Sequence, residues 1–321
     1  MNRLNIKVAF VGIVKTSTLF LFILFICQKV NAQQLGSDKF IDISYANDLF
    51  TGTDEYFTQG IRIEVALPIF RKTPIALMSF LPKRNSESIY SIALQQDGFT
   101  PSSIRYDSIL QGDRPYCASM FITNSQYSYY KNKKMFIHTQ IAVGAIGPLA
   151  LGYEEQTAIH KAIKDELPKG WKHQIQNDLI LNYIFAMQQN FFTKSWISVA
   201  YNTQARLGTM FTDVAIGLNA KIGLYNDNLK TQKSKLQIYG FGNTHMKTVA
   251  YNATLQGGML NKSSDYTFSQ SDIKRLIPIA EIGVGAGYRK LNILFSHTYI
   301  GKEFINGANH AWGKLSLMIG F

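Results

Sequence analysis

Cysteine is nearly absent from this chain. Its 321 residues include only 2 cysteines, and one of them, Cys27, lies in an N-terminal segment that resembles a targeting sequence. With Cys117 alone in the rest of the chain, no intramolecular disulfide can form, which excludes a small disulfide-stapled secreted domain. The sequence also lacks Pro/Ser-rich linkers, charge runs and repeats of fixed period, so no domain boundary is indicated.

The first residues have the pattern of an export signal. A basic start is followed by the apolar residues 19–26 and by the small-residue cleavage site Val30-Asn31-Ala32. A membrane-spanning helix needs roughly 20 apolar residues, so a retained anchor is the weaker alternative. We therefore expect residues 1–32 to be a signal peptide and residues 33–321 to form the exported domain.

No later segment is long and continuously apolar, which argues against a helical membrane protein. Aromatic residues make up 13% of the chain and the mean hydropathy is −0.04. These values fit a membrane β-barrel, in which lipid-facing and lumen-facing residues alternate; a secreted β-sandwich is the alternative. The final segment favours the barrel, because Leu315, Leu317 and Ile319 alternate with other residues and the terminal aromatic Phe321 resembles an outer-membrane insertion signal.

Period-two alternation recurs along the chain and predicts an all-β fold, a transmembrane antiparallel β-barrel of about 12 strands. The strands are expected at 38–48, 57–69, 87–97, 117–130, 134–146, 174–190, 194–206, 211–224, 234–251, 276–288, 289–300 and 310–321. An even strand number places both chain termini on one side of the membrane, which in bacteria is the periplasm. The long segments 98–116, 147–173 and 252–275 then face outward, opposite the short turn Lys131-Asn132-Lys133.

Two strand ends bring oxygen-bearing side chains to this outer rim. Asn47 and Asp48 end the first predicted strand, and Thr58 begins the second. Asn and Asp often form turns, so a purely structural role is one interpretation. An amide, a carboxylate and a hydroxyl close together are also suitable ligands for calcium, although their spacing is not that of an EF-hand loop.

A short helix is expected in the outer loop 147–173, and it supplies a candidate base. Gly147-Pro148 opens the segment, and Leu167-Pro168 ends the helix. Gln156 and His160 are four residues apart, so a helix presents both on one face. Imidazole suits general-base catalysis near neutral pH; the alternative is that His160 is an ordinary surface residue.

Two arginines in the segment 98–116 are candidates for binding the phosphate of an anionic lipid. The guanidinium groups of Arg105 and Arg114 have the planar geometry that phosphate favours. A structural alternative is that Asp113 and Arg114 cap a loop and form an ion pair.

Nucleophilic serine chemistry is not indicated. The chain has no Gly-x-Ser-x-Gly motif and no serine placed beside a histidine. Water is therefore the simpler nucleophile. His160 would take a proton from water, and a bound divalent cation would stabilise the oxyanion.

In their order and spacing, these motifs resemble the outer-membrane lipid A 3′-O-deacylase family. The motifs that carry the resemblance lie within residues 40–185 and are Asn47-Asp48, Thr58-Gln59-Gly60, Thr100-Pro101, Gly112-Asp113-Arg114, Gly147-Pro148, Gln156, His160, Glu166 and Pro168–Gln174. The resemblance implies a twelve-stranded barrel that removes the 3′-linked acyloxyacyl chain of lipid A with calcium. Where the family has a lysine after the Thr-Pro pair, this chain has Arg105.

The resemblance also implies roles for the individual residues. His160 would activate water, and the other catalytic-site residues would be Asn47, Thr58, Gln156 and Glu166. Asp48 would bind Ca²⁺, and Arg105 and Arg114 would bind substrate. The expected partner is lipid A or lipopolysaccharide in the outer leaflet, reached from the extracellular side. No nucleic-acid partner is expected, and the oligomeric state stays open.

Two other functions stay open at this point. An outer-membrane phospholipase is suggested by Tyr56–Gly60, but such enzymes use a His-x-Ser pair, which His297-Thr298 does not match. A non-enzymatic channel or binding barrel is the second, although a dozen strands would be tight for a wide pore. Replacement of His160 by alanine separates these classes, because only an enzyme would lose activity.

Overall fold

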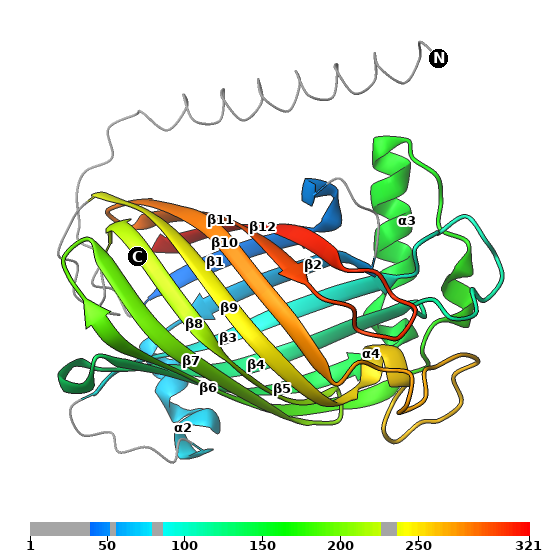
Figure 1. Ribbon diagram of the computed structural model, residues 1–321, viewed down its shortest axis with the longest axis horizontal. Helices are drawn as coiled ribbons and strands as arrows, with labels where there is room; N and C mark the ends of the chain where they lie inside the picture. Colours follow the sequence, from blue (N-terminus) through cyan, green and yellow to red (C-terminus); the bar gives the residue numbers. More distant parts are fainter. Residues whose placement is uncertain (1–38, 52–55, 79–85, 226–235) are drawn as a thin grey trace, which may run out of the picture. The chain divides into compact units, whose positions relative to one another are not determined.

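The computed structural model of the protein describes residues 39–51, 56–78, 86–225 and 236–321. In this part of the chain, strands β1 to β12 close into one antiparallel barrel (Figure 1). They are β1 (Phe40–Asn47), β2 (Tyr56–Ala66), β3 (Ser86–Thr100), β4 (Cys117–Tyr130), β5 (Met135–Ile146), β6 (Asp178–Thr193), β7 (Ile197–Gly208), β8 (Phe211–Leu224), β9 (Leu236–Asn252), β10 (Leu276–Tyr288), β11 (Leu291–Ile300) and β12 (His310–Gly320). The predicted twelve-stranded barrel is confirmed. The predicted signal peptide, residues 1–32, lies outside the described residues.

Successive side chains of each strand point to opposite faces of the wall. In β4, Thr123 is buried toward the lumen, whereas Ile122 faces outward and is 57% exposed. Ile43, Leu94 and Val143 are exposed in the same way on neighbouring strands. These outward apolar side chains form the surface that a bilayer would cover, which explains why the average hydropathy is close to zero.

Pairing of the first strand with the last closes the barrel. Phe40 of β1 lies opposite Gly320 of β12, and Asn47 lies opposite Gly313. Each of the other strands pairs with its neighbours in sequence. Because the strands alternate in direction, the connections that follow odd-numbered strands all lie at one end of the barrel.

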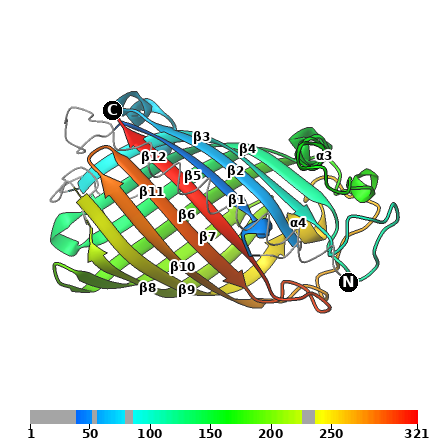
Figure 2. The same cartoon turned by 90° about the horizontal axis from the view of Figure 1, so that it is seen from above.

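The short helices divide between the two ends (Figures 1 and 2). They are η1 (Asp48–Thr51), η2 (Pro68–Lys72), α2 (Ile75–Met78), η3 (Lys131–Lys133), η4 (Pro148–Ala150), α3 (Gly152–Ile163), η5 (Gly170–His173) and α4 (Ala253–Gln256). The long connections that carry α3 and α4 lie at one end, and α2 lies at the other. None of the helices in the described ranges is long and apolar enough to cross a membrane.

The predicted loop helix is present as α3 and ends earlier than expected. Lys164 adopts the left-handed conformation with φ 57°, and its N–H bonds back to the carbonyls of His160 and Lys161. This C-cap stops the helix before Leu167-Pro168 is reached. The next strand begins at Asp178, four residues later than predicted. The Ile175 N–H donates to Tyr116 O at 2.9 Å, which ties this stretch to the residue that precedes β4 instead of to a strand partner.

Candidate functional site

Helix α3 packs on the outside of the barrel wall. A Cβ added at Gly152 would lie 2.5 Å from Ala118 Cβ, so glycine allows the helix to approach β4 closely. Just before the helix, Gln96 Nε2 of β3 donates to Ala150 O at 2.6 Å, and Gly147 N donates to Ala118 O at 2.8 Å. Gln96 and Ala118 share the strand face of the exposed Leu94 and Ile122, which is the outer one. The residues beneath α3 therefore face outward and not into the lumen.

Three of the predicted site residues meet at the ends of β1 and β2. Asn47 Nδ2 donates to Thr58 O at 2.6 Å, and Asn47 Oδ1 accepts from Leu49 N at 2.7 Å. Asp48 follows in η1 and is only 3% exposed. The Asn47 side chain thus links the start of η1 to β2 through these two hydrogen bonds. Asn47 therefore stabilises the turn and also lies in the candidate site.

A β-bulge turns Thr58 toward this cluster. In the pairing of β2 with β3, Phe57 lies opposite Phe99 and Gln59 lies opposite Gly98, so Thr58 is the extra residue. The Phe57 ring packs against Trp312, while Thr58 Oγ1 lies 2.5 Å from Thr100 Oγ1. Bulges often re-aim side chains next to functional sites, and alternation in the sequence alone does not reveal this one.

Gln156 lies buried between α3 and the wall. It is 1% exposed, and its Oε1 accepts a hydrogen bond from Trp171 Nε1 at 2.6 Å. This bond fixes the amide orientation, because an indole nitrogen can only donate. The Gln156 Nε2 group is then directed elsewhere, and it has no hydrogen-bond partner among the described residues. Gln156 therefore holds a buried donor that no described residue satisfies.

His160 lies in the last turn of α3, one turn beyond Gln156 on the same side. Its Nδ1 is within hydrogen-bond distance of Glu166 O. A carbonyl oxygen only accepts, so the contact requires a proton on Nδ1 and leaves the lone pair of the neutral ring on Nε2.

The Glu166 side chain forms ion pairs with two basic residues at the surface. Its Oε2 lies 2.9 Å from Arg105 Nε, and its Oε1 lies 3.9 Å from Lys169 Nζ. The Arg105 side chain is 73% exposed. The structure thus brings Arg105 to the rim next to α3, where its guanidinium remains accessible.

Arg114 takes the opposite direction, into the lumen. Its side chain is 1% exposed, and Nη1 lies 2.6 Å from Glu303 Oε2. Nη2 donates to Thr254 Oγ1 at 2.6 Å, and the guanidinium lies over the Phe99 ring at 4.5 Å. These groups border an internal cavity of about 420 Å³. Arg114 does form an ion pair, but its partner is Glu303 and not Asp113, the partner expected from the sequence. Arg114 also does not lie together with His160, so the two predicted site residues are separate in the structure.

The Arg114 pair gives the barrel an acid-sensitive contact. Burial alone would raise the pKa of Glu303, but the charges of Arg114, Lys247 and His310 outweigh it and hold the pKa at about 2. Because the pKa is lower in the folded protein than in the unfolded chain, where it is roughly 4.3, the ionised carboxylate stabilises the fold at pH values above that. This stabilisation is lost as the pH falls from roughly 4.3 toward about 2. We predict that the urea midpoint of the wild type falls between pH 4 and pH 2 more steeply than that of the double variant Arg114→Met/Glu303→Leu. Parallel curves would contradict this prediction.

Glu155 on α3 also belongs to the candidate site, although it was not among the residues predicted from the sequence. Both carboxylate oxygens are buried and have no hydrogen-bond partner within the described ranges. Burial, with a smaller effect from the charge of Asp97, raises the pKa of Glu155 to about 7. Glu155 and Asp48 both lie near enough to the Tyr45 hydroxyl to interact with it electrostatically. The signal in the sequence was an acidic residue three positions after Gly152, the contact point of the helix.

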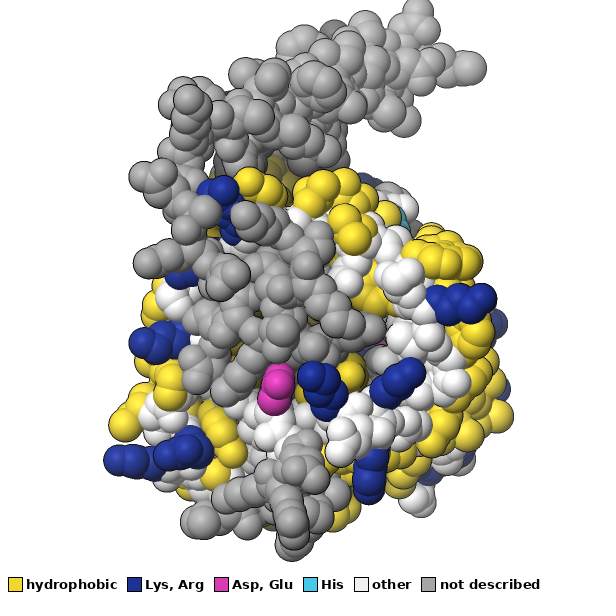
Figure 3. All heavy atoms as spheres, turned by 90° about the vertical axis from the view of Figure 1, so that its left-hand side faces the viewer, with side chains coloured by type: hydrophobic (Ala, Val, Ile, Leu, Met, Phe, Trp, Pro, Cys, Tyr) yellow, Lys and Arg dark blue, Asp and Glu magenta, His cyan; other side chains and the backbone are white. Residues whose placement is uncertain are grey.

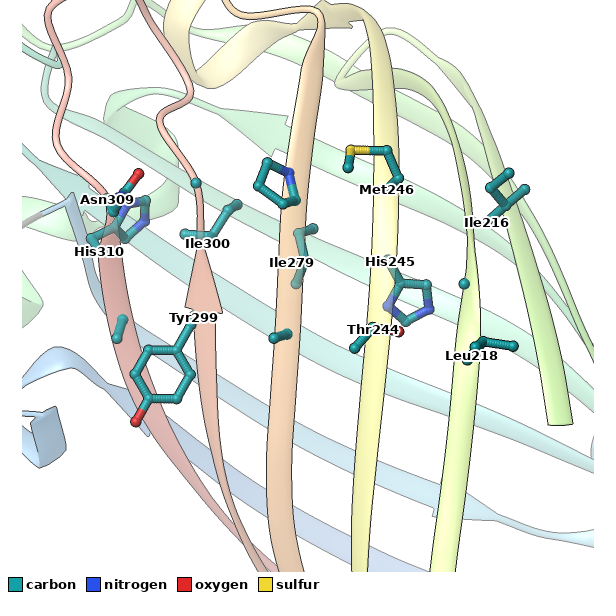
Figure 4. A pocket seen from close by; sticks show the side chains of 15 residues that line it. Ile216, Leu218, Thr244, His245, Met246, Ile279, Tyr299, Ile300, Asn309 and His310 are labelled. Atoms are coloured by element: carbon teal, nitrogen blue, oxygen red, sulfur yellow. The ribbon is translucent and has the colours of Figure 1, made fainter. Parts of the chain in front are cut away.

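A hollow of the described surface lies elsewhere, on the outer wall formed by β8 to β12 (Figure 4). It has a volume of about 760 Å³ and is lined mainly by apolar side chains, including Ile216, Leu218, Met246 and Tyr299. These side chains are exposed and outward-facing. The hollow is a recess of the lipid-facing surface, and it contains none of the predicted site residues.

One protein family and several solved structures are similar to this chain. The family described as "Outer membrane protein LpxR" matches residues 19–321. The solved structure of LpxR from Salmonella typhimurium is similar at 20% sequence identity, covers 88% of this chain and 100% of its own, and superposes with a TM-score of 0.72. The β-domain of the Bordetella autotransporter BrkA matches at 7% identity over 88% of this chain and 98% of its own, with a TM-score of 0.45. No curated protein sequence matches the chain.

The similarity to the Salmonella structure supports the fold, and the family match extends over the whole described barrel. The chain therefore belongs to the LpxR family of outer membrane proteins.

Proposed function

We propose that the chain is an outer-membrane ester hydrolase that removes the 3′-linked acyloxyacyl chain of lipid A. The observation that supports it best is the location of His160 and Gln156 on a helix packed against the outside of the barrel wall. An ester in a membrane lipid reaches this surface by lateral diffusion, whereas a solute channel would place its polar groups in the lumen. The resemblance in the sequence supplies the substrate class.

In this proposal, His160 is the general base. With the Nδ1 proton held by Glu166 O, the Nε2 lone pair is available to take a proton from water. The ring then carries a positive charge, which the helix C-terminus and the Glu166 carbonyl stabilise. The Glu166 contribution to catalysis comes from its backbone, while its carboxylate holds Arg105 at the rim.

Gln156 and the strand-end residues complete the site. The Gln156 Nε2 donor would hydrogen-bond the ester carbonyl oxygen as negative charge develops on it. Asn47 positions Asp48 by clamping the two strand ends, and Thr58 adds a hydroxyl to the same surface. Arg105, exposed and at the rim, would contact a phosphate of the substrate.

The residues present fit a calcium ion. Calcium prefers carboxylate and other oxygen ligands, and the site contains the buried carboxylate Asp48 together with Glu155, whose two oxygens have no hydrogen-bond partner among the described residues. We propose that Asp48 and Glu155 would hold the ion. Bound calcium would supply a Lewis acid that polarises the ester carbonyl and stabilises the oxyanion.

This assignment predicts an effect on calcium binding that is independent of activity. Glu155→Gln is expected to weaken calcium binding by about tenfold or more, because it removes one of the two proposed anionic ligands. Isothermal titration calorimetry of the folded protein measures the affinity. Glu154→Gln is the matched control, because Glu154 is its exposed neighbour on α3. Equal affinities for the Glu155 variant and the wild type would remove Glu155 from the proposed site.

The proposal also orients the barrel. Bacterial barrels have longer extracellular loops and shorter periplasmic turns, so we propose that the end with α3 and α4 faces outward. His160 would then meet the outer leaflet, where lipopolysaccharide resides.

Hydrolysis of purified substrates tests the proposed function. The folded protein with calcium should release the 3′-linked acyloxyacyl group from lipid A, and a chelator should abolish release. Phosphatidylethanolamine and phosphatidylglycerol under the same conditions test the phospholipase alternative. Cleavage of phospholipid with intact lipid A would replace the proposal by that alternative, and no hydrolysis of either by a folded barrel would favour a binding protein or channel.

A further inference from the structure

The two ends of the barrel differ in charge. At the end with α3 and α4, the described connections contain equal numbers of basic (Lys and Arg) and acidic (Asp and Glu) residues. At the opposite end, the described connections contain Lys and Arg but no Asp or Glu. Figure 3 looks onto this second end, where basic side chains surround the described surface and acidic ones are scarce. Among the described connections, the net positive charge is therefore concentrated at one end of the barrel.

Six exposed residues define what we call the basic rim. They are Arg71, Lys72, Lys131, Lys133, Lys134 and Lys194. The turns that carry the lysines adjoin one another, since Gln189 Nε2 donates to Lys133 O and Asn190 N donates to Lys134 O at 3.1 Å. Lys194 follows directly after the strand that contains Gln189. The four lysines of the basic rim therefore lie on two adjoining turns, and the two remaining cations, Arg71 and Lys72, lie on another connection at the same end of the barrel.

The segment with Arg71 and Lys72 folds back onto the outer face of the wall. Ile75 is fully buried in contact with Tyr90 and with the partly buried Ile141 and Tyr183. Its N–H donates to Asn124 Oδ1 at 3.2 Å. Asn124 shares the strand face of the exposed Ile122, which is the lipid-facing one. The segment therefore lies against the membrane-facing surface of the barrel (Figure 1), with its apolar side on the wall and its two cations exposed.

Exposed aromatic side chains mark the depth of the membrane surface next to this rim. Phe191, Phe192 and Trp196 lie at the turn that contains Lys194 and are between 42% and 61% exposed. The Lys194 ammonium lies 5.7 Å from the Phe192 ring centre. Aromatic girdles of membrane barrels sit at the level of the lipid headgroups. The cations of the basic rim are consequently at the height of the phosphates.

We propose that the basic rim binds the headgroups of anionic glycerophospholipids and prefers them over zwitterionic ones. Lysine and arginine at a membrane surface attract anionic lipids, and no carboxylate in the described connections of this end competes for them. The inference depends on the chain being an outer-membrane barrel, as its family is. It does not depend on the ester hydrolysis proposed for the other end of the barrel.

Native mass spectrometry of the full protein with phosphatidylglycerol or phosphatidylethanolamine of identical acyl chains tests this proposal. The four-residue variant Arg71→Gln/Lys72→Gln/Lys131→Gln/Lys133→Gln is compared with a control of equal charge change, Lys161→Gln/Lys164→Gln/Lys274→Gln/Lys302→Gln, at the opposite end. We expect the wild type and the control to bind phosphatidylglycerol about tenfold more tightly than phosphatidylethanolamine, and the rim variant to lose most of this preference.

Circular dichroism tests whether each variant is folded. If the four-residue variant does not fold, the smaller variant Arg71→Gln/Lys72→Gln replaces it, and this variant is expected to lose part of the preference for phosphatidylglycerol. An undiminished preference in the rim variants would overturn the proposal. So would an equal loss in the control, because the preference would then reflect total charge and not the rim.

Discussion

Replacement of His160 by alanine is expected to lower the rate of lipid A ester hydrolysis by about 10²–10⁴-fold, the usual contribution of a positioned general base. The reason is that Nε2 is the group oriented to take a proton from water, since the Glu166 carbonyl holds the other ring nitrogen. The measurement is the single-turnover rate with purified lipid A and saturating calcium. The melting temperature should change little, because the ring lies at the surface of the last helical turn.

His173→Ala is the matched control for this experiment. His173 lies in the same connection, but its Nδ1 contacts Asp265 Oδ2 at 3.1 Å near the protein surface. Its loss should leave the hydrolysis rate within about threefold of the wild type, as expected for a group outside the reaction. A His160→Ala protein that hydrolyses lipid A at the wild-type rate would show that another group activates water.

Replacement of Arg114 by methionine is expected to lower the free energy of unfolding by about 3–5 kcal/mol, the cost of leaving a buried charge without its partner. Glu303 would lose the 2.6 Å ion pair, and Thr254 would lose its hydrogen bond from Nη2. Urea unfolding in detergent micelles measures the change. Arg105→Met provides the comparison and should have little effect, because the Arg105 ion pair is exposed to solvent.

The double variant Arg114→Met/Glu303→Leu should recover part of the lost stability, since it removes both charges from the lumen. If Arg114→Met alone were as stable as the wild type, the buried pair would contribute nothing, and Arg114 could be considered again for substrate binding.

The strands were predictable from the sequence because alternation is a local property. Ile61, Ile63 and Val65 show it directly, and all twelve predicted strands are present. Local signals failed where the chain turns back on itself. The η2–α2 segment packs on the outer wall through Ile75, whose contacts with Tyr90 and Ile141 depend on strands that come later in the sequence.

In the candidate site too, the features set by local spacing were predictable, and those set by contacts distant in sequence were not. Gln156 and His160 were found because helical spacing relates them, and their placement on one side of α3 follows from that spacing. The directions of Arg105 and Arg114 were not predictable, because Arg114 turns inward toward Glu303, which follows it by 189 residues. The presence of Glu155 in the site depends on the angle at which α3 packs against the wall, and no spacing rule specifies that angle.

The most direct test of the central claim is mass spectrometry of lipid A from cells that express the wild type, His160→Ala or the folded control His173→Ala. The proposed function predicts that the wild type and the control remove the 3′-linked acyloxyacyl group, that His160→Ala does not, and that a calcium chelator stops removal by isolated membranes. Lipid A that keeps this group in cells where the wild-type barrel is folded and in the outer membrane, or that loses it equally with His160→Ala, would contradict the claim.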